Sequence, residues 1–266
     1  MPSGSDQQQP ILYSISAGVA TITLNMAERR NSLSDELVGG LADTLDDAYA
    51  DDQARAIVLT NTGNTFCAGA DLKSDAPGLA GDVPAEPKRT FVDVFKMMLA
   101  GPKPIVGRID GHATGGGVGL VAACDISVMR DDAKIGFTEV RIGVAPAVIS
   151  VVCLPKMSRA DASELFLTGA RFTPERAAQA GLINRAVPSA DLDASVDEFV
   201  SMLVRGGPLA LAAAKNLVHR VPAMNVDDAF DWTAIRSREL FMSDEAKVGI
   251  AAFRNREVAP WVPLET

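Results

Sequence analysis

The chain has 266 residues, of which 47% are hydrophobic and 22% are charged, so it is long enough to bury a sizeable core. Its net charge of −9 excludes nucleic acid and anionic membranes as expected partners, because a polyanion repels an acidic surface. Its three cysteines are odd in number and lack metal-ligand spacing, so neither a disulfide framework nor a zinc site is expected.

The first ten residues are polar and lack the apolar core of a signal peptide. The longest apolar stretch, 142–154, is interrupted by Pro146 and is too short to cross a bilayer. The sequence therefore favours a soluble cytoplasmic protein without a membrane partner.

The sequence pattern over residues 11–49 predicts a β-hairpin followed by a helix. Alternating runs at 11–16 and 19–24 flank the turn residues Ala17 and Gly18, which is typical of a hairpin. Ser34 is a candidate N-cap for the helix. The apolar residues that recur at helical spacing after it are Leu37, Leu41, Leu45 and Tyr49.

The next part of the chain predicts two strands separated by a loop and a helix. A continuous apolar run at 56–60 ends in a turn at 61–64, as a buried strand does. The segment 73–88 is rich in Pro, Gly, Asp and Ala and has no clear period, which indicates a long loop. A helix at 91–99 then precedes a strand at 104–109.

A further strand is predicted at 125–129, so strands and helices alternate, with glycine at the crossings. This alternation favours an α/β fold with a largely parallel sheet and helices packed outside it. After Val187 the pattern is helical throughout, and we place a domain transition near residue 190. The expected layout is a tail at 1–10, an α/β core at 11–190 and a helical region at 191–266.

Two Gly/Ala-rich segments, FCAGAD at 66–71 and GHATGGGVG at 111–119, each follow a strand-like run and lead toward a helix-like one. Backbone N–H groups at a helix start have no acceptor upstream, so two such groups facing one oxygen would form an oxyanion hole. Close packing of a strand on a helix is the alternative explanation for the glycines. The second segment matches neither a dinucleotide-binding G-x-G-x-x-G pattern nor a P-loop.

Glu139 follows these segments in an apolar stretch that also contains the charge of Arg141. Apolar surroundings disfavour a charged carboxylate and raise its pKa toward the working pH, as a proton carrier requires. We therefore predict that Glu139 serves an enzyme that makes and protonates an enolate. The alternative is a carboxylate that pairs with Arg141.

Other reactive side chains have structural interpretations. His112 and His219 lack metal-ligand spacing, so no metal is expected. Cys67 has no evident His or Asn partner, which favours a packed thiol over a nucleophile. No G-x-S-x-G elbow of a serine hydrolase is present in the sequence. Arg29 and Arg30 form either a solvated pair or a site for ligand phosphates.

The sequence resembles the enoyl-CoA hydratase/isomerase (crotonase) family over residues 11–262, with its motifs in the expected order. The matching segments are NMAERRNSLS, TFCAGADLK, DGHATGGGVGLVAACDISV, IGFTEVRIGVAPAVIS, LTGARFTPERAAQAGLINRAVP and AAFRNRE. The resemblance implies a spiral of ββα repeats with a C-terminal helical trimerisation region. It also implies a homotrimer or homohexamer, an acyl-CoA thioester substrate and no cofactor besides the coenzyme A of that substrate.

Carried over by position, the resemblance assigns the oxyanion donors to the N–H groups of Ala68 and Gly116, and proton transfer to Glu139. Gly119 stands where ordinary hydratases have the first of two glutamates, so Glu139 would act as a single carboxyl. The residues expected to bind CoA are Arg29, Ala70, Asp71, Leu72, Phe253 and Arg256, the last two in the same or a neighbouring subunit. The loop after Leu72 is expected to shape the acyl pocket.

The string TEVRIGVAPAVIS is similar to a bacterial branch of methylglutaconyl-CoA hydratases and related enzymes, which favours hydration of a 2,3 double bond. Three alternatives stay open at this point. They are a Δ3,Δ2-enoyl-CoA isomerase, an acyl-CoA thioester hydrolase and a catalytically silent acyl-CoA-binding protein.

Overall fold

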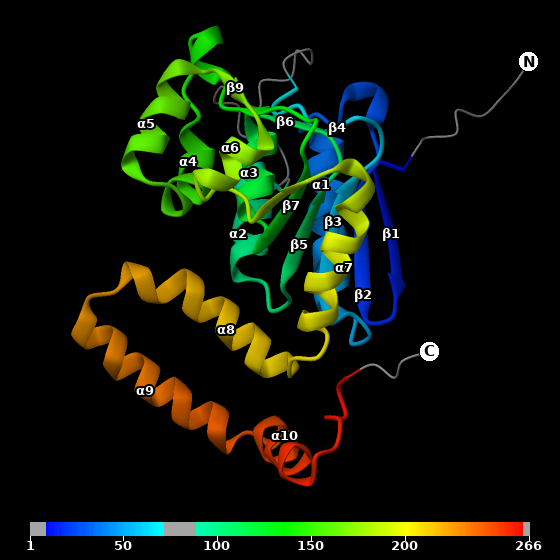
Figure 1. Cartoon of the computed structure of the whole chain (residues 1–266), viewed down its shortest axis with the longest axis vertical. Coiled ribbons are helices and arrows are strands. Elements are labelled where there is room, and N and C mark those ends of the chain that lie inside the picture. Colours follow the sequence, from blue (N-terminus) through cyan, green and yellow to red (C-terminus); the bar gives the residue numbers. More distant parts are fainter. Residues whose placement is uncertain (1–8, 72–88, 263–266) are drawn as a thin grey trace, which may run out of the picture.

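The computed structural model describes residues 9–71 and 89–262, in which strands and helices alternate before the chain becomes wholly helical (Figure 1). The strands are β1 (Ile11–Ser16), β2 (Val19–Leu24), β3 (Ala56–Asn61), β4 (Thr65–Cys67), β5 (Ile105–Ile109), β6 (His112–Thr114), β7 (Ile126–Arg130), β8 (Ile135–Gly136), β9 (Arg171–Phe172) and β10 (Arg185–Val187). The helices are α1 (Asp35–Ala50), α2 (Phe91–Ala100), α3 (Gly116–Ala123), α4 (Ala147–Cys153), α5 (Arg159–Thr168), α6 (Pro174–Gln179), α7 (Leu192–Leu203), α8 (Pro208–Arg220), α9 (Val226–Met242) and α10 (Asp244–Asn255). Two short 3₁₀ turns, η1 (Ala27–Arg29) and η2 (Glu139–Ile142), also bear on the site.

The larger sheet has six strands in the order β1-β2-β3-β5-β7-β10, and all neighbours are parallel except the β1–β2 pair. The antiparallel pair is the predicted hairpin. Its turn residues Ala17 and Gly18 have φ values of 48° and 79°, as a two-residue turn that matches strand twist requires. The expectation of a largely parallel sheet is confirmed.

The smaller sheet has the order β4-β6-β8-β9 and is built from very short strands. Three successive units, β3-β4-α2, β5-β6-α3 and β7-β8-α4, each place their first strand in the larger sheet and their second strand in the smaller one. Each unit therefore advances the chain by one turn of a spiral. This is the repeated ββα arrangement that the sequence led us to expect.

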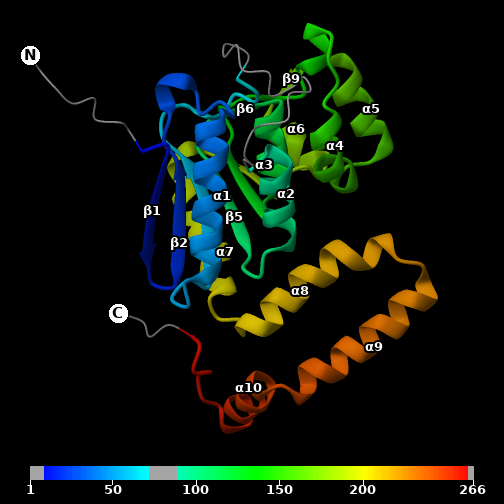
Figure 2. The same cartoon turned by 180° about the vertical axis from the view of Figure 1, so that it is seen from behind.

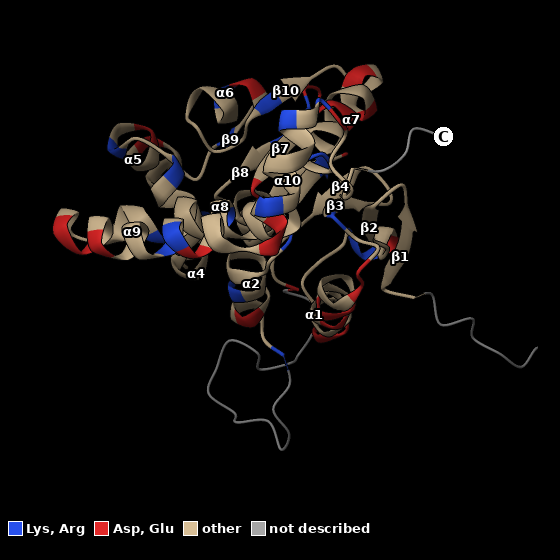
Figure 3. Ribbon diagram, turned by 90° about the horizontal axis from the view of Figure 1, so that it is seen from below, with Lys and Arg blue, Asp and Glu red and all other residues tan. Residues whose placement is uncertain are grey.

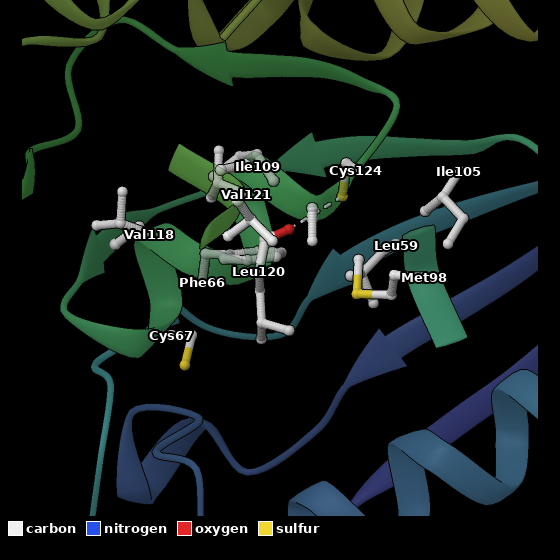
Figure 4. Close-up of a cluster of buried hydrophobic side chains, with 14 of the residues drawn as sticks. Leu59, Phe66, Cys67, Met98, Ile105, Ile109, Val118, Leu120, Val121 and Cys124 are labelled. Carbon is white, nitrogen blue, oxygen red and sulfur yellow. Dashed lines mark hydrogen bonds between the residues drawn. The ribbon is translucent and has the colours of Figure 1, made fainter. Parts of the chain in front are cut away.

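Alternate residues of the central strands bury opposite faces of the larger sheet. Ile57 and Leu59 belong to the main core under α1 and α2, whereas Val58 faces α7 on the other side. Figures 1 and 2 show these two helical layers from the front and the back. Part of the main core around α3 is drawn in Figure 4. Each large side chain buried in this way stabilises the fold by about 2 kcal/mol.

Helix α1 begins where the sequence predicts, because the Oγ of Ser34 accepts a hydrogen bond from the backbone N–H of Leu37 at 3.3 Å. The apolar face predicted for this helix is buried at Leu37, Leu41 and Leu45. The predicted loop at 73–88 and the predicted contact residue Leu72 lie outside the described residues.

The C-terminal helices leave the body of the molecule only after α7. Helix α7 still packs on the larger sheet, through Leu192, Val196 and Val200. Helices α8, α9 and α10 then extend below the body as an arm (Figures 1 and 2). The domain transition predicted near residue 190 stays a prediction. Because α7 packs on the larger sheet, this helix belongs to the body of the molecule and not to the arm.

One buried ion pair fastens the arm to the body. The Nζ of Lys215 in α8 lies 2.8 Å from a carboxylate oxygen of Asp125, which precedes β7, and the Lys215 side chain is 4% exposed. His219, one turn later in α8, lies 3.3 Å from the other oxygen of Asp125. Within the described ranges no helix is long and apolar enough to span a membrane, and no cluster of His, Cys, Asp or Glu suited to a metal occurs.

Candidate active site

The two Gly/Ala-rich segments are brought together by the smaller sheet. Strand β4 pairs in parallel with β6, so the chain leaves both strands at the same edge. A Cβ atom added to Gly69 would lie 2.8 Å from the carbonyl oxygen of Thr114 and 3.1 Å from the backbone nitrogen of Gly116. Gly69 also has φ +84°, which L side chains rarely adopt. Only glycine allows this approach, so the two segments form one site.

Glu139 joins this site from the next turn of the spiral. Strand β8 pairs with β6, and η2 begins directly afterwards at Glu139. A Cβ atom added to Gly115 would lie 3.3 Å from the Oε1 of Glu139. The carboxyl group therefore lies against the residue that precedes α3.

Two backbone N–H groups at this edge are available as donors. Neither Gly116, which opens α3, nor Ala70, which follows Gly69, donates to an acceptor among residues 9–71 and 89–262. The N–H of Gly116 also lies at the positive end of the α3 dipole. An oxygen that carries developing negative charge would be stabilised here.

The prediction that Ala68 supplies the first oxyanion donor is wrong for this conformation. Its N–H already donates to the carbonyl oxygen of Arg30 at 3.1 Å. Gly69 then turns the chain, and Leu33 donates to the Gly69 carbonyl at 2.8 Å. The amide left without a described acceptor is that of Ala70, which the sequence assigned to CoA binding.

Burial raises the pKa of Glu139 above its ordinary value, and a hydrogen bond from its own backbone amide offsets only part of this effect. Its Oε2 atom is buried and has no hydrogen-bond partner among the described residues. The alternative interpretation, an ion pair with Arg141, is not what the described structure contains. A buried carboxyl oxygen without a partner is suited to take up and return a proton.

The turn after η1 brings two predicted CoA-binding residues together. The guanidinium of Arg29 donates to the carboxylate of Asp71 at 2.8 Å and is half exposed. The turn itself is held by Asn31, a buried residue with φ +49° that sequence analysis missed. Its amide donates to the carbonyl oxygens of Thr62 and Thr65, at 3.1 and 2.8 Å. Asn tolerates positive φ better than most residues, which is the one clue that the sequence offered.

Phe253 and Arg256 are not brought to this edge within one chain. Both lie at the end of α10, and Phe253 is 85% exposed. Figures 1 and 2 place α10 at the opposite end of the molecule from β4 and β6. A hollow of ≈ 480 Å³ between α8 and α9, lined in part by Arg220 and Trp232, is likewise remote from Glu139.

The remaining reactive side chains have the structural roles predicted for them. Burial raises the pKa of the Cys67 thiol to about 12, so this group is not a thiolate nucleophile at neutral pH. The Nδ1 of His112 accepts the backbone N–H of Lys134 at 2.9 Å. His219 contacts Asp125. All three cysteines are buried and free.

Comparison with known proteins places this geometry in context. The model of the family described as enoyl-CoA hydratase/isomerase matches residues 14–263. The chain is 34% identical over 237 residues to a Thermus thermophilus protein named provisionally as an enoyl-CoA hydratase, covering 88% of this chain and 94% of that one. It is 29% identical to the 1,2-epoxyphenylacetyl-CoA isomerase of Escherichia coli K12, covering 91% and 94% of the two chains. The crystal structure of a Mycobacterium smegmatis enoyl-CoA hydratase superposes with a TM-score of 0.84 at 29% identity, covering 95% and 98%.

Proposed function

This chain belongs to the enoyl-CoA hydratase/isomerase family, and we propose from that premise that it adds water across the 2,3 double bond of an acyl-CoA thioester. The observation that carries the proposal is the meeting of three groups at one edge. The N–H groups of Ala70 and Gly116, which have no acceptor among the described residues, lie on the two segments joined at Gly69. The Glu139 carboxyl, whose Oε2 has no hydrogen-bond partner in the same part of the chain, lies against Gly115.

The first step is binding of the thioester. Its carbonyl oxygen accepts hydrogen bonds from Ala70 and Gly116, which polarise the conjugated double bond. As water attacks Cβ, electrons move onto this oxygen and the thioester becomes an enolate. Each donor that meets the new charge lowers the barrier by about 3 kcal/mol.

Glu139 moves the proton. As a carboxylate it takes one proton from the attacking water, and the hydroxyl group bonds to Cβ. The protonated Glu139 then gives that proton to Cα, the enolate collapses to the thioester, and the carboxylate is restored. One carboxyl thus serves both steps, and such catalysis contributes about 10²- to 10⁴-fold in rate.

The proposed reaction calls for no cofactor beyond the coenzyme A of the substrate. Arg29 supplies a half-exposed cation for its phosphates in an otherwise acidic chain, and Asp71 orients that cation through the 2.8 Å hydrogen bond. Ala70 and Leu72 complete this part of the proposed CoA site. The cytoplasmic location inferred from the sequence is part of the same proposal.

We also propose that the protein works as a homotrimer or homohexamer in which Phe253 and Arg256 close over CoA bound to a neighbouring subunit. Large apolar side chains on the arm support this proposal, because they are exposed in the single chain. Those more than two-thirds exposed on α8, α9 and α10 are Val218, Val226, Phe230, Phe241, Met242 and Phe253.

The test is incubation with a panel of straight and branched 2-enoyl-CoA thioesters in ¹⁸O-labelled water, followed by mass analysis. A hydratase gives 3-hydroxyacyl-CoA that carries one label. With 3-enoyl-CoA thioesters added to the panel, their conversion to 2-enoyl thioesters without label would instead establish the isomerase, which the family's description as hydratase/isomerase keeps as the second candidate. Release of free thiol would identify a thioester hydrolase. Tight acyl-CoA binding without any turnover would contradict an enzymatic role.

A further inference from the structure

Two apolar side chains, Ile149 and Phe95, pack against Gly119, one helical turn beyond the proposed oxyanion donor Gly116. We call these two side chains the apolar wall. Gly119 follows Gly116 by three residues, so both lie on one face of α3, and the Gly119 N–H donates to the carbonyl of Gly115, the residue before the helix, at 3.4 Å. Gly115 itself, just before α3, lies against the Glu139 carboxyl. At Gly119 the three atoms nearest to a Cβ position are carbons of Ile149 and Phe95.

The wall is tightly packed. A Cβ atom added to Gly119 would lie 2.5 Å from the Cγ2 of Ile149 and 2.6 Å from the Cζ of Phe95. These two side chains come from α4 and α2 and are 3% and 4% exposed. The Phe95 ring also packs on Phe91, at 4.3 Å between centroids, and Phe91 in turn lies 3.0 Å from the Cβ position of Gly116. A continuous apolar surface thus runs along α3 from Gly116 to Gly119.

In the proposed complex with a thioester, the acyl group follows this surface. Its carbonyl oxygen is fixed at Gly116, and its α-carbon must lie within reach of Glu139 beside Gly115. The next atoms of the chain then pass along the same face of α3. The distance from Gly116 to Gly119 along a helix is about 4.5 Å, which leaves room for only a short chain.

We propose that Ile149 and Phe95 are specificity-determining residues that restrict this protein to acyl-CoA thioesters with a short main chain. The inference rests on the proposed function for the identity of the ligand. It adds the residues that set chain length. Because both side chains are buried core residues that pack against Gly119, a longer chain has to displace packed core atoms, which is costly.

The test is calorimetric binding of saturated acyl-CoA thioesters from butanoyl to decanoyl, which needs no turnover. The wild-type protein is expected to bind butanoyl-CoA at least about ten-fold more tightly than octanoyl-CoA. Equal or tighter binding of octanoyl-CoA to the wild-type protein would overturn the proposal before any variant is made.

Two substitutions at one position then isolate the atom responsible. Ile149→Ala removes the Cγ2 atom that covers Gly119 and should raise the octanoyl-to-butanoyl affinity ratio by about ten-fold or more. Ile149→Val keeps Cγ2 and should leave the ratio near the wild-type value. Val152→Ala, a buried truncation in the same helix, controls for general loosening of α4. An Ile149→Ala ratio equal to that of Ile149→Val would contradict the proposal.

Failure of this inference can be told apart from failure of the proposed function. If the protein binds short acyl-CoA more tightly than long acyl-CoA but does not hydrate the matching 2-enoyl thioester, the proposed reaction is wrong. The proposed role of Ile149 and Phe95 in chain-length selection is then still supported. If it hydrates 2-enoyl thioesters of all lengths equally well, the proposed chain-length selection is wrong and the proposed reaction is supported.

Discussion

At the scale of single residues, the site depends on one partly buried carboxyl group. Glu139 is half-buried, and its Oε2 atom finds no donor among the residues that the structure describes. Such a group is a cost to stability, since desolvation disfavours its charged form. We interpret this loss of stability as the consequence of placing Glu139 in the proposed active site, where it has to transfer a proton.

The raised pKa of Glu139 predicts the pH dependence of the rate. Hydration needs the carboxylate, so kcat/KM should rise with pH along an acid limb whose midpoint lies above the ordinary glutamate pKa of 4.5. Initial rates on a short 2-enoyl-CoA between pH 4 and 9 measure this limb. A midpoint at or below the ordinary value would show that burial does not act on the catalytic carboxyl.

The same shift predicts how stability responds to pH. The native protein holds the Glu139 proton more tightly than the unfolded chain does. The stabilisation from this proton is therefore complete below the unfolded pKa, and it is lost as the pH rises through the native pKa. Glu139→Gln should accordingly have a higher urea midpoint than the wild-type protein at pH 8, and the gain should shrink at pH 4. A gain that is independent of pH would contradict the linkage.

Gly69→Ala tests the contact that joins the two oxyanion segments. The new Cβ would lie 2.8 Å from the Thr114 carbonyl oxygen, at a φ of +84°, so the amides of Ala70 and Gly116 should be displaced. We expect kcat to fall about 10²- to 10³-fold, the loss seen when an oxyanion donor is removed. The matched control is Gly39→Ala in α1, where nothing lies within 4 Å of the new Cβ and activity should be unchanged. Equal activity in both variants would contradict the proposed site.

The sequence patterns alone singled out Glu139 and the segment 111–119, because an isolated carboxyl in an apolar stretch and a glycine cluster before a helix are local patterns. The family resemblance then assigned one oxyanion donor to Gly116. It assigned the other donor to Ala68, and this was wrong for a non-local reason. The acceptor that occupies the Ala68 amide is the carbonyl of Arg30, which is distant in sequence. The packing of Ile149 and Phe95 against Gly119 could not be predicted for the same reason, since three separate helices supply the contact.

At the scale of elements, the long periodic segments were predictable and the short ones were not. The hairpin, α1, β3 and β5 follow from alternation, helical spacing and the Ser34 cap. The smaller sheet was missed, because β4, β6, β8 and β9 have two or three residues each and cannot show a period. Their existence is decided by pairing across the spiral, and this pairing builds the site.

Asp125 links α8 to the body of the molecule through its ion pairs with Lys215 and His219. Burial alone would raise its pKa, but the contacts with His219 and Lys215 and the Ile105 N–H outweigh burial and hold the pKa below its usual value. The resulting stabilisation is present above the unfolded pKa and is lost as the pH falls through the lower native value. Acid should therefore loosen α8 from the body.

Asp125→Asn should destabilise the protein at pH 7 by about 3 kcal/mol, because it leaves the buried Lys215 ammonium without a counter-charge. Urea denaturation followed by circular dichroism measures the change. Asp193→Asn is the matched control, since the Asp193 side chain is 74% exposed and its ion pair with Arg108 should contribute less than about 1 kcal/mol. Similar losses for both variants would show that the Asp125–Lys215 pair does not anchor the arm.

At the scale of the whole molecule, the arm formed by α8, α9 and α10 exposes several large apolar side chains in the single chain. Figure 3 shows that acidic and basic residues are interspersed on α9, while the outer side of α1 is acidic. The net charge of −9 makes copies of the chain repel one another, so the proposed assembly calls for a specific apolar contact.

Phe241→Asp should shift the protein toward monomer in light scattering coupled to size-exclusion chromatography. The substitution places a charge where a 71% exposed apolar ring would otherwise be buried between copies. Gln53→Asp adds the same charge on the body and should leave the oligomer intact. A wild-type protein that is already monomeric at micromolar concentration would contradict the proposed assembly.

The central claim is that one carboxyl, Glu139, moves the proton of an enolate held by two backbone amides. The most direct measurement is kcat of Glu139→Gln on a short 2-enoyl-CoA, with saturated acyl-CoA affinity measured on the same sample and Glu175→Gln as an exposed control. We expect kcat to fall about 10³-fold while the affinity stays near the wild-type value, because the backbone amides are untouched. A Glu139→Gln protein that turns over at the wild-type rate would contradict the central claim.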